Sequence, residues 1–412
     1  MRRRVVVTGM GVVSPIGNDI ASFRESLFAG RHGIGPITQF DTSEYKATIG
    51  AEVKNFSARD YMENAEMLRS DPNSHFAIAA ASQAVEDSGI IGTLPPQRIS
   101  VYFGTGIGGI QTFTAEVDKL RSKGPRRVSP YFIPMMIANM ASGMIAIRFN
   151  CQGAALPAVT ACASGSNALG EALRAIRHGY TDAVIAGGCE ASIAECGVAG
   201  FINMQALSVA QDPDAASLPF DARRGGFVIG EGAGALILEE YEHALARGAH
   251  IYGELCGYGS TCDAYHVTAP HPEGLGAVAA MKEALAEAGY TSETRLYINA
   301  HGTGTPLNDA METRAIKTLL GEDLAKRTPV SSTKSMTGHM LGAAGAVEAI
   351  ACLLALNENR LPPTVGLHSP DPELDLDYVP LVARDAEIDM ALSNSLGFGG
   401  HNACLAFRKL SK

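Results

Sequence analysis

Short runs of β-branched and other apolar residues alternate along the chain with longer stretches in which apolar residues recur every three or four positions. The short runs predict strands, and the longer Ala-rich stretches predict helices, several of which end at a glycine such as Gly89 or Gly179. The predicted strands span residues 4–8, 99–103, 156–161, 183–186, 235–239, 251–256, 295–300, 329–332 and 391–395. The predicted helices span residues 17–29, 74–88, 166–178, 274–288, 309–319 and 344–357.

The order of these elements predicts an α/β protein with mainly parallel sheets covered by helices. The pattern recurs on both sides of Arg247–Ala249, which indicates two halves of related topology, 1–248 and 249–412. No Pro/Ser-rich linker separates them, so we expect close packing. Residues 110–142 are less regular, and their prolines predict a loop-rich excursion of the kind that often carries binding surfaces.

Composition narrows the class of protein further. A net charge of −10, no Trp and 6% aromatic residues exclude a general nucleic-acid binder. No uninterrupted apolar stretch reaches 18 residues, and the N-terminal apolar run breaks at Thr8-Gly9, so we expect neither a membrane span nor a secretion signal. The eight cysteines form no Cys-x-x-Cys pair, which argues against disulfides and zinc and favours the cytoplasm.

One segment joins a strand end, a turn of small residues and the start of a helix. It reads Pro157-Ala158-Val159-Thr160-Ala161-Cys162-Ala163-Ser164-Gly165-Ser166 and places Cys162 near a helix N-terminus. There the helix dipole favours a thiolate, and free backbone N–H groups can bind an oxyanion. The small neighbours of Cys162 leave room for a substrate, although a buried structural cysteine is the alternative interpretation.

Two other predicted strands end in histidines. His301 follows the strand at 295–300, and His339 lies a few residues after the strand at 329–332. Either ring alone is compatible with a purely structural role. Because sites in open α/β sheets gather at the carboxyl ends of strands, we expect both rings to lie near Cys162.

A possible buried ion pair and a glycine-rich turn add to this pattern. Glu348 is the one acidic residue on the predicted helix 344–357 and needs a buried partner, for which Lys334 is the candidate. The run Gly397-Phe398-Gly399-Gly400 lets backbone approach a ligand closely and present an N–H group. A simple tight turn would have the same composition.

Three features resemble sites of other classes of protein, but each lacks a residue or leaves one unexplained. Gly104–Gly109 matches G-x-G-x-x-G, but no Asp or Glu stands about 20 residues later, as a dinucleotide site requires. Asp263, His266 and His271 lack the i, i+4 histidine pair of a zinc helix. A papain-type hydrolase would leave the second histidine and Lys334 without a role.

The chain resembles the β-ketoacyl-acyl carrier protein synthases, in particular those of the synthase II type. The similarity runs from Val5-Val6-Val7-Thr8-Gly9-Met10-Gly11 to Gly397-Phe398-Gly399-Gly400 and rests on Thr160-Ala161-Cys162, Ala300-His301-Gly302-Thr303 and Lys334-Ser335-Met336-Thr337-Gly338-His339. It implies a thiolase-like, five-layered αβαβα fold of two related halves, usually dimeric. The implied reaction is a decarboxylating Claisen condensation of malonyl-acyl carrier protein with a Cys-bound acyl chain, as in fatty acid elongation.

The resemblance implies a catalytic set of Cys162, His301, His339, Lys334, Glu348 and Phe398. Cys162 would hold the acyl chain as a thioester, and the two histidines would stabilise the enolate that CO₂ loss leaves. The N–H groups of Cys162 and Phe398 would bind the thioester oxyanion, and Lys334 with Glu348 would orient the site. No metal or redox cofactor is implied, because CO₂ release drives formation of the carbanion. The phosphopantetheine arm arrives on the carrier protein.

Substrate and partner contacts also follow from the resemblance. The pantetheine positions are Thr303 and Thr305, the acyl-pocket positions are Ile107, Phe201 and Leu396, and the carrier-docking positions are Arg126, Arg127 and Arg69. Many family members have Phe where this chain has Leu396. Residues 64–73 are less basic than usual, and Gln205 replaces a commonly basic residue, which weakens generic docking of an acidic carrier.

These departures leave alternatives open. A dedicated carrier would make the protein the ketosynthase subunit of a type II polyketide or polyene pathway, and a heterodimer with a related subunit would replace the expected homodimer. A non-catalytic chain-length partner would lack the active cysteine that this chain has. A degradative thiolase would use a second cysteine where this chain has His339.

Overall fold

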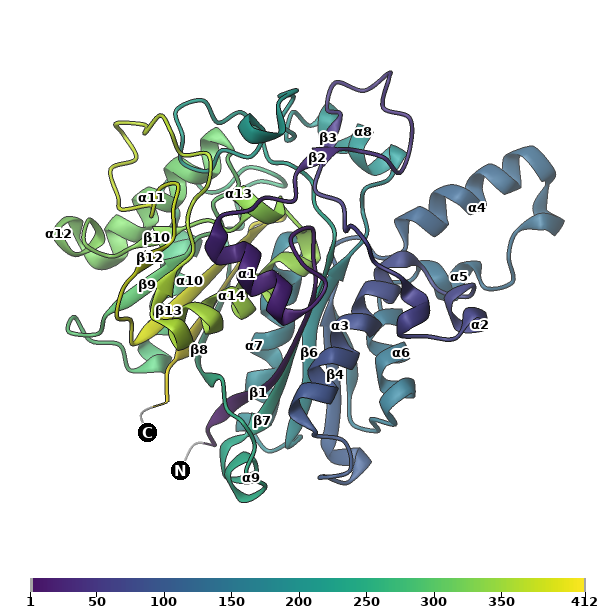
Figure 1. The fold of residues 1–412 in the computed structure, drawn as a ribbon, viewed down its shortest axis with the longest axis horizontal. Helices are drawn as coiled ribbons and strands as arrows, with labels where there is room; N and C mark the ends of the chain where they lie inside the picture. The colour runs from purple at the N-terminus through teal and green to yellow at the C-terminus, as the bar shows by residue number, and fades with distance from the viewer. Residues whose placement is uncertain (1–2, 411–412) are drawn as a thin grey trace.

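A large mixed sheet forms the centre of the computed structural model, which describes residues 3–410 (Figure 1). Its strands are Val5–Val13 (β1), Ile99–Gly104 (β4), Ala155–Ala158 (β5), Ala183–Glu190 (β6), Gly232–Glu240 (β7), Gly253–Cys262 (β8), Leu296–Asn299 (β9), Val330–Ser331 (β10), Met390–Gly397 (β13) and His401–Arg408 (β14). Two short ladders pair Gly35–Pro36 (β2) with Ile49–Gly50 (β3) and Arg360–Leu361 (β11) with Arg384–Asp385 (β12).

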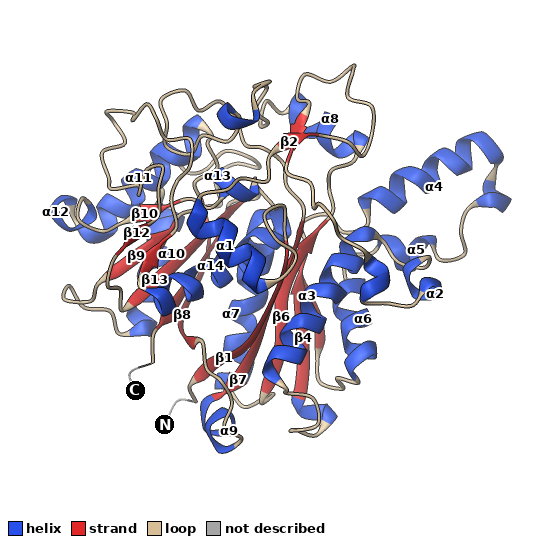
Figure 2. Cartoon of the chain, viewed as in Figure 1, coloured by secondary structure: helices blue, strands red, loops and turns tan. Residues whose placement is uncertain are grey.

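Helices cover this sheet and connect its strands (Figure 2). They are Ile20–Ala29 (α1), Asn64–Met67 (α2), Pro72–Ser88 (α3), Ile110–Lys123 (α4), Phe132–Met136 (α5), Met140–Phe149 (α6), Ser164–Arg177 (α7), Glu195–Asn203 (α8), Tyr241–Ala246 (α9), Leu275–Ala288 (α10), Pro306–Leu320 (α11), Glu322–Ala325 (α12), Lys334–Thr337 (α13) and Ala344–Glu358 (α14). Caps account for several ends, such as the Asp71 side chain at the start of α3 and Gly89, with φ of 60°, at its end.

The sheet consists of two runs of strands that share one pattern of antiparallel and parallel pairing. One run is β1-β7-β6-β4-β5, and the other is β8-β14-β13-β9-β10. In both, the first three strands are antiparallel neighbours and the last three are parallel ones. A short antiparallel contact of β1 with β8, Val6 opposite Glu254 and Val7 opposite Gly253, joins the runs. The chain is therefore built from two related halves; the boundary after residue 248 stays a prediction.

Helices lie in three layers around these two runs. α7 and α14 pack against each other and against strands of both halves, so they form the middle layer. α3 covers β1, β6 and β7 on one outer face, and α10 covers β8 and β14 on the other (Figure 1). This arrangement confirms the predicted five-layered αβαβα fold.

The composition of α14 suits its central place. Almost every residue of this Ala- and Leu-rich helix is buried, as expected for a helix that is apolar all round. Within residues 3–410, Leu341–Glu358 is the one helical stretch long and apolar enough to cross a membrane, but 89% of it is buried inside the protein. It is therefore explained as a core helix.

Two local predictions are wrong. The sheets are not mainly parallel, because β7 and β14 run antiparallel to both of their neighbours, and β14 follows β13 through the tight turn at Phe398–Gly400. The stretch 110–142 is also largely helical. α4 is a projecting helix (Figure 1) whose apolar residues recur at helical spacing at Ile110, Phe113, Val117 and Leu120, but its buried residues are Thr112 and Glu116.

Candidate active site

Cys162 lies in a sharp turn between β5 and α7. We call residues 161–165 the first elbow: a 3₁₀ turn, Ala161–Ala163, leads directly into α7 at Ser164. Ala161 has φ of 51°, a left-handed conformation that is uncommon for alanine. The Ser164 hydroxyl holds the turn by donating to the Ala161 carbonyl at 2.7 Å and accepting from the Thr160 N–H at 2.9 Å. The predicted position of Cys162 is confirmed.

His301 follows β9 and is held from behind by a buried carboxylate. Glu312 on α11 accepts the backbone N–H groups of His301 and Gly302, each at 2.8 Å. A side chain at position 302 would lie 2.6 Å from the Ser332 Cβ, and Gly302 has φ of 37°, so only glycine fits here. These contacts fix the backbone from which the imidazole extends.

His339 is attached to a different segment. Its N–H donates to the Val228 carbonyl at 2.7 Å, and its carbonyl accepts from Gly230 N–H at 2.9 Å. Phe227, in the same segment, packs edge-on against the ring with centroids 5.1 Å apart. The imidazole is therefore set by one aromatic contact and two backbone bonds.

The structure brings the two rings and the thiol into one cavity. The ring centroids of His301 and His339 lie 5.2 Å apart at 85°. The cavity measures about 400 Å³. Of the residues predicted to form the site, its lining includes Cys162, Phe201, His301, Thr303, Thr305, His339, Leu396 and Phe398. Thr303 and Thr305 share a hydroxyl hydrogen bond of 2.9 Å at its wall.

Burial controls protonation in this cavity. It raises the pKa of the Cys162 thiol to about 12, and the opposing charge of Lys334 does not offset this. Desolvation therefore favours the neutral thiol in the resting protein, whereas the helix dipole alone would favour the thiolate. Burial and the Lys334 charge hold the pKa of both His301 and His339 well below the usual value. Both imidazoles are thus neutral at pH 7, each with one N–H donor and one acceptor nitrogen.

Lys334 and Glu348 form the ion pair that the sequence predicted. Their side chains are 1% and 3% exposed, and the Lys334 Nζ contacts Glu348 Oε1. Burial raises the pKa of Glu348, while the ammonium of Lys334 acts against that rise. The pair lies behind the cavity and brings a positive charge close enough to influence the thiol and both rings.

Two backbone N–H groups face the sulfur. Those of Cys162 and Phe398 lie close enough to Cys162 Sγ to lower the pKa of the thiol. Phe398 belongs to the turn between β13 and β14, and a side chain at Gly397 would lie 3.2 Å from Cys162 N. Donors in this position can hold an oxygen that becomes negative on a carbon attached to the sulfur.

Besides Lys334 and Glu348, which lie behind the cavity, four of the predicted residues lie outside its lining. Ile107 does not line it, and its side chain is 41% exposed. Arg126 and Arg127 are exposed in a short turn after α4. Arg69 is exposed as well, with its guanidinium 4.8 Å from the centre of the Tyr131 ring.

The sequence analysis missed two buried glutamates beside the site. Glu312 supports His301, and Glu190, at the end of β6, accepts backbone N–H groups next to Cys162, including Gly342 N–H at 3.0 Å. The spacing of Asp309, Glu312 and Ile316 on one helix face was the available signal for Glu312. Glu190 ends an apolar strand, and no local pattern distinguishes it.

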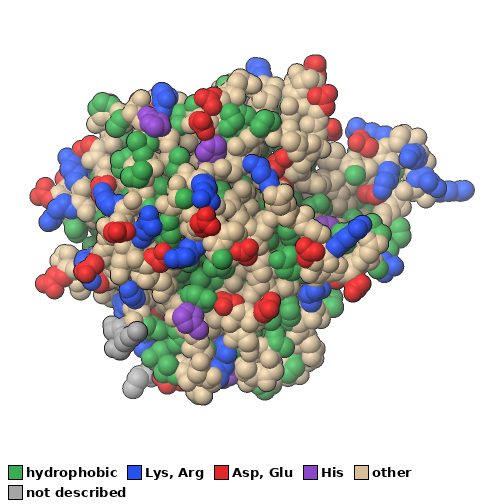
Figure 3. Space-filling model, in the orientation of Figure 1, with side chains coloured by type: hydrophobic (Ala, Val, Ile, Leu, Met, Phe, Trp, Pro, Cys, Tyr) green, Lys and Arg blue, Asp and Glu red, His purple; other side chains and the backbone are tan. Residues whose placement is uncertain are grey.

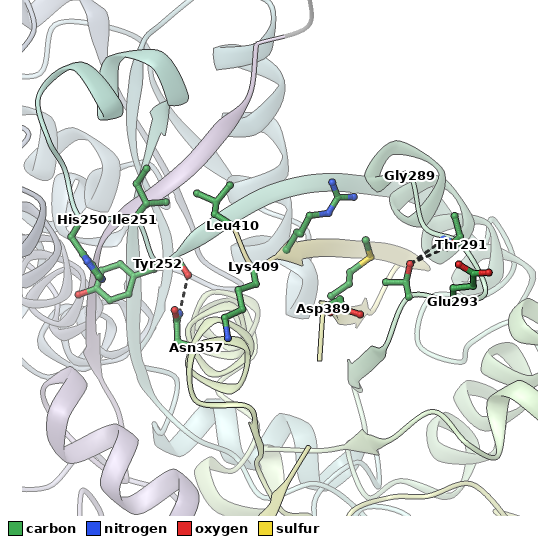
Figure 4. A pocket seen from close by; sticks show the side chains of 13 residues that line it. His250, Ile251, Tyr252, Gly289, Thr291, Glu293, Asn357, Asp389, Lys409 and Leu410 are labelled. Atoms are coloured by element: carbon green, nitrogen blue, oxygen red, sulfur yellow. Dashed lines mark hydrogen bonds between the residues drawn. The ribbon is translucent and has the colours of Figure 1, made fainter. Parts of the chain in front are cut away.

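A second, larger hollow lies elsewhere. It measures about 960 Å³ and lies beside the C-terminal end of β14, with His250, Tyr252, Asn357 and Lys409 in its lining (Figure 4). The Asn357 amide donates to the Tyr252 carbonyl at 2.8 Å across it. None of the predicted site residues lines this hollow, so its size does not make it the reactive centre.

Metal ligation gets no support from the described residues. Within residues 3–410, no group of three or more His, Cys, Asp and Glu side chains could hold a metal ion. In the trio that the sequence analysis considered, Asp263 accepts the His271 N–H at 2.9 Å, and His266 Nδ1 accepts the Ala269 N–H at 3.0 Å. These contacts order the loop that borders the cavity.

Family models match both halves of the chain. The "Beta-ketoacyl synthase, N-terminal domain" model matches residues 2–244, and the "Beta-ketoacyl synthase, C-terminal domain" model matches residues 252–368. The chain belongs to the β-ketoacyl synthase family. The resemblance seen in the sequence is therefore confirmed, and with it the assignment to the acyltransferase class of enzymes.

Relatives of this β-ketoacyl synthase cover almost its whole length. "3-oxoacyl-[acyl-carrier-protein] synthase 2" of Synechocystis sp. is 53% identical over 410 residues, 99% of this chain and 98% of the relative. The Staphylococcus aureus (strain COL) protein of the same name is 49% identical over 408 residues, again 99% and 98%.

Solved structures confirm the thiolase-like ketosynthase fold. "The ishigamide ketosynthase/chain length factor" superposes with a TM-score of 0.94 at 36% identity and covers 100% of both chains. A type II PKS acyl-carrier protein in complex with its ketosynthase gives 0.92 at 33% identity, with 100% of both chains covered.

Proposed function

We propose that this synthase condenses malonyl-acyl carrier protein with an acyl chain held on Cys162, releases CO₂ and yields 3-oxoacyl-acyl carrier protein in fatty acid elongation. The observation that carries this proposal is the shared cavity of one thiol, two neutral imidazoles and two N–H donors facing the sulfur. The 49–53% identity to relatives named 3-oxoacyl-[acyl-carrier-protein] synthase 2 supports the same reaction.

Loading comes first. The Cys162 sulfur attacks the thioester carbon of acyl-carrier protein, and a neutral imidazole of the cavity takes the thiol proton. The N–H groups of Cys162 and Phe398 hold the oxyanion, and the pantetheine thiol leaves with the proton returned to it. Because the thiolate is the stronger nucleophile, the protonated resting thiol reacts slowly until an imidazole takes its proton.

Condensation follows on the same sulfur. Malonyl thioester loses CO₂, and the enolate oxygen that forms accepts N–H bonds from His301 and His339. Both rings are neutral, and a neutral imidazole carries one N–H, so each ring can donate one hydrogen bond to this oxygen. The enolate carbon then attacks the Cys162 thioester, which forms the new carbon–carbon bond and expels the Cys162 thiolate. Uptake of one proton from solvent restores the resting thiol. The residues present supply all the groups that these steps use, so we infer that no resident metal or redox cofactor takes part.

The partner that delivers both substrates is an acidic acyl carrier protein. Basic side chains gather where α4 projects from the molecule (Figure 3), and Arg126 and Arg127 lie exposed in the turn that follows. Thr303 and Thr305 lie at the cavity wall, where a pantetheine arm would pass. One solved relative is, by its printed description, a ketosynthase in complex with its acyl-carrier protein. The free cysteines of the protein suit a reducing compartment, so we propose that the enzyme works in the cytoplasm.

A second copy of the chain would cover the free edge of the sheet. β5 is the last strand of its run, and Leu156 on it is 50% exposed. Leu156 and Tyr180, which is 78% exposed, line one apolar hollow of about 410 Å³ beside this edge. An unpaired apolar edge favours strand pairing with another chain, so we propose a homodimer through β5.

The function is tested by the mass of the products from purified protein, malonyl-carrier protein and a series of acyl primers. We expect each accepted primer to gain two carbons and a 3-oxo group, and Cys162 to carry the primer when malonyl-carrier is omitted. An acyl adduct on another residue, or products without CO₂ release, would contradict the proposal.

A second candidate keeps the chemistry but changes the pathway. Two solved relatives are, by their descriptions, ketosynthases with a chain length factor or of a type II PKS. Leu396 and the reduced basic character of residues 64–73 are compatible with a dedicated carrier. The higher identity to the synthase 2 relatives favours fatty acid elongation; iterative products of more than one extension with a related subunit present would favour the alternative.

A further inference from the structure

The buried side chains of the projecting helix α4 are polar (Figure 1). They belong to Thr112 and Glu116, and the Glu116 side chain is only 5% exposed. Glu116 Oε1 contacts the ammonium of Lys119, and Oε2 accepts the backbone N–H of Ser129 at 2.8 Å. The Lys119 contact and the Ser129 N–H hold the pKa of Glu116 below its usual value, so the carboxylate is ionised at pH 7. The proposed chemistry does not use this charge.

The bond to Ser129 closes the segment that carries two exposed arginines. Gly124, with φ of 79°, ends α4, and the 3₁₀ turn Pro125–Arg127 follows directly. The carboxylate lies 13 positions before Ser129, inside the helix, so it holds the far end of the turn against the helix. Among the residues that the structure describes, neither the Arg126 nor the Arg127 guanidinium has a hydrogen-bond or ion-pair partner. Both are therefore free to bind an anionic partner.

We propose that Glu116 is a positioning residue that fixes the turn Pro125–Arg127 in the conformation that an acidic carrier protein binds. The inference rests on the proposed function, because the docking role of Arg126 and Arg127 comes from the family resemblance. A turn that is ordered before binding loses less conformational entropy when the carrier docks, so the carrier binds more tightly. Without the carboxylate, the Ser129 N–H would lose its acceptor, and the turn would be free to move away from α4.

Positioning and charge predict opposite effects at this residue. Glu116 places a negative charge close to the docking turn, so by charge alone its removal should favour an acidic carrier. Positioning predicts weaker binding instead, because the two arginines lose their fixed place. Glu116→Asp separates the two effects further, since it keeps the charge while its shorter side chain cannot reach Ser129.

The test follows acylation of Cys162 by intact mass, with hexanoyl-acyl carrier protein or with hexanoyl-pantetheine, which is the same primer without the protein. Glu116→Ala and Glu116→Asp should each raise the half-saturating concentration of the carrier-bound primer about fivefold, with little change in the maximal rate. Acylation by the free primer should stay within about twofold of the wild-type rate, because it does not use the docking turn. Glu116→Gln keeps an oxygen for the Ser129 N–H and should stay within about twofold with both primers.

Asp118→Ala is the matched control, since it removes an exposed carboxylate from the same helix and should not raise the half-saturating concentration. The double variant Arg126→Glu with Arg127→Glu should raise it at least as much as Glu116→Ala, and no effect there overturns the inference. If Glu116→Ala does not fold, Glu116→Asp carries the test alone. A folded Glu116→Ala or Glu116→Asp enzyme also overturns it if its value for the carrier-bound primer is at or below that of the wild type, or if both primers lose equally. Failure of the wild type itself to acylate at Cys162 would instead overturn the proposed function.

Discussion

The first elbow has a counterpart in the other half of the molecule. Residues 341–345, the second elbow, also begin with a non-glycine residue in the left-handed region, Leu341 at 45° against Ala161 at 51°. Each elbow continues through a 3₁₀ turn into a middle-layer helix, α7 or α14. Gly342 occupies the place that Cys162 has in the first elbow.

The difference between the two elbows lies in what their backbone N–H groups meet. The N–H of Cys162 faces its own sulfur and remains available to a substrate oxygen, whereas Glu190 accepts the N–H of Gly342. A side chain at position 342 would lie 2.2 Å from Gly106 N, so the second elbow is closed by packing as well. The same backbone conformation therefore carries the nucleophile in the first half and makes only structural contacts in the second.

Removing the thiol should have the largest effect. Cys162→Ala should abolish the acyl adduct and lower condensation on the order of 10⁴-fold or more, because the open elbow then has no nucleophile. Intact mass after incubation with acyl-carrier protein measures the adduct. Cys196→Ala, which removes an exposed thiol on α8, is the control and should acylate normally. An adduct on Cys162→Ala would refute the assignment.

Filling the second elbow should destabilise the fold. Gly342→Ala places a methyl group against the backbone of Gly106 and Thr105, which should cost about 3 kcal/mol of unfolding free energy. Urea unfolding measures the loss. Gly143→Ala in α6 is the control, since open space surrounds that position and alanine should add about 0.5–1 kcal/mol. Equal stability of Gly342→Ala and the wild type would mean that the two elbows are equally open.

Reversing the charge of the exposed turn after α4 should affect only the delivery of substrate to Cys162 in the first elbow. Replacing Arg126 and Arg127 by Glu should raise the carrier KM about tenfold with little change in kcat, because attraction to an acidic carrier is lost. Steady-state kinetics at two salt concentrations measures this, and the difference should shrink at high salt. Arg327→Glu, an exposed change beyond α12, should leave KM unaltered. An unchanged KM in the double variant would place docking elsewhere.

The smallest effect should be that of pH on decarboxylation. In Cys162→Gln, whose amide resembles the acylated cysteine, malonyl-carrier should still lose CO₂. Because the pKa values of His301 and His339 are lowered well below 6.5, both rings stay neutral as pH falls from 8 to 6, and the rate should change less than twofold. CO₂ release against pH measures this. His339→Asn in the same background should be slow throughout, whereas a fall centred near pH 6.5 in Cys162→Gln would contradict neutral rings.

Local signals account for what the sequence could predict. The turn of small residues around Cys162 and the apolar run before His301 predicted their positions at strand ends, because strand, turn and helix starts are encoded within about ten residues. Lys334 could be matched to Glu348 because an unpaired buried acid needs a cation. The αβαβα arrangement itself came from the family resemblance, since periodicity alone does not number the layers.

Distant contacts account for what it could not. Glu190 meets Gly342 across 152 positions in the chain, and nothing near either residue indicates that contact. The antiparallel β14 was not predicted because the glycine-rich turn before it concealed the strand that follows. The helix α4 was not predicted because the prolines of residues 110–142 were given more weight than the helical spacing of Ile110, Phe113, Val117 and Leu120. The desolvation that favours the neutral Cys162 thiol could not be predicted either, because the dipole is a local property of the turn, while desolvation depends on the whole surrounding fold.

The pairing of β1 with β8 has a mechanical consequence. The pairing joins the two halves directly, with Val6 opposite Glu254 and Val7 opposite Gly253. The strand runs of both halves therefore form one continuous sheet. The sulfur from one half and the imidazoles from the other are then brought into register when the polypeptide folds, before any substrate arrives. Heating should accordingly melt both halves in a single cooperative step, and catalysis should need only loop movement rather than hinge closure.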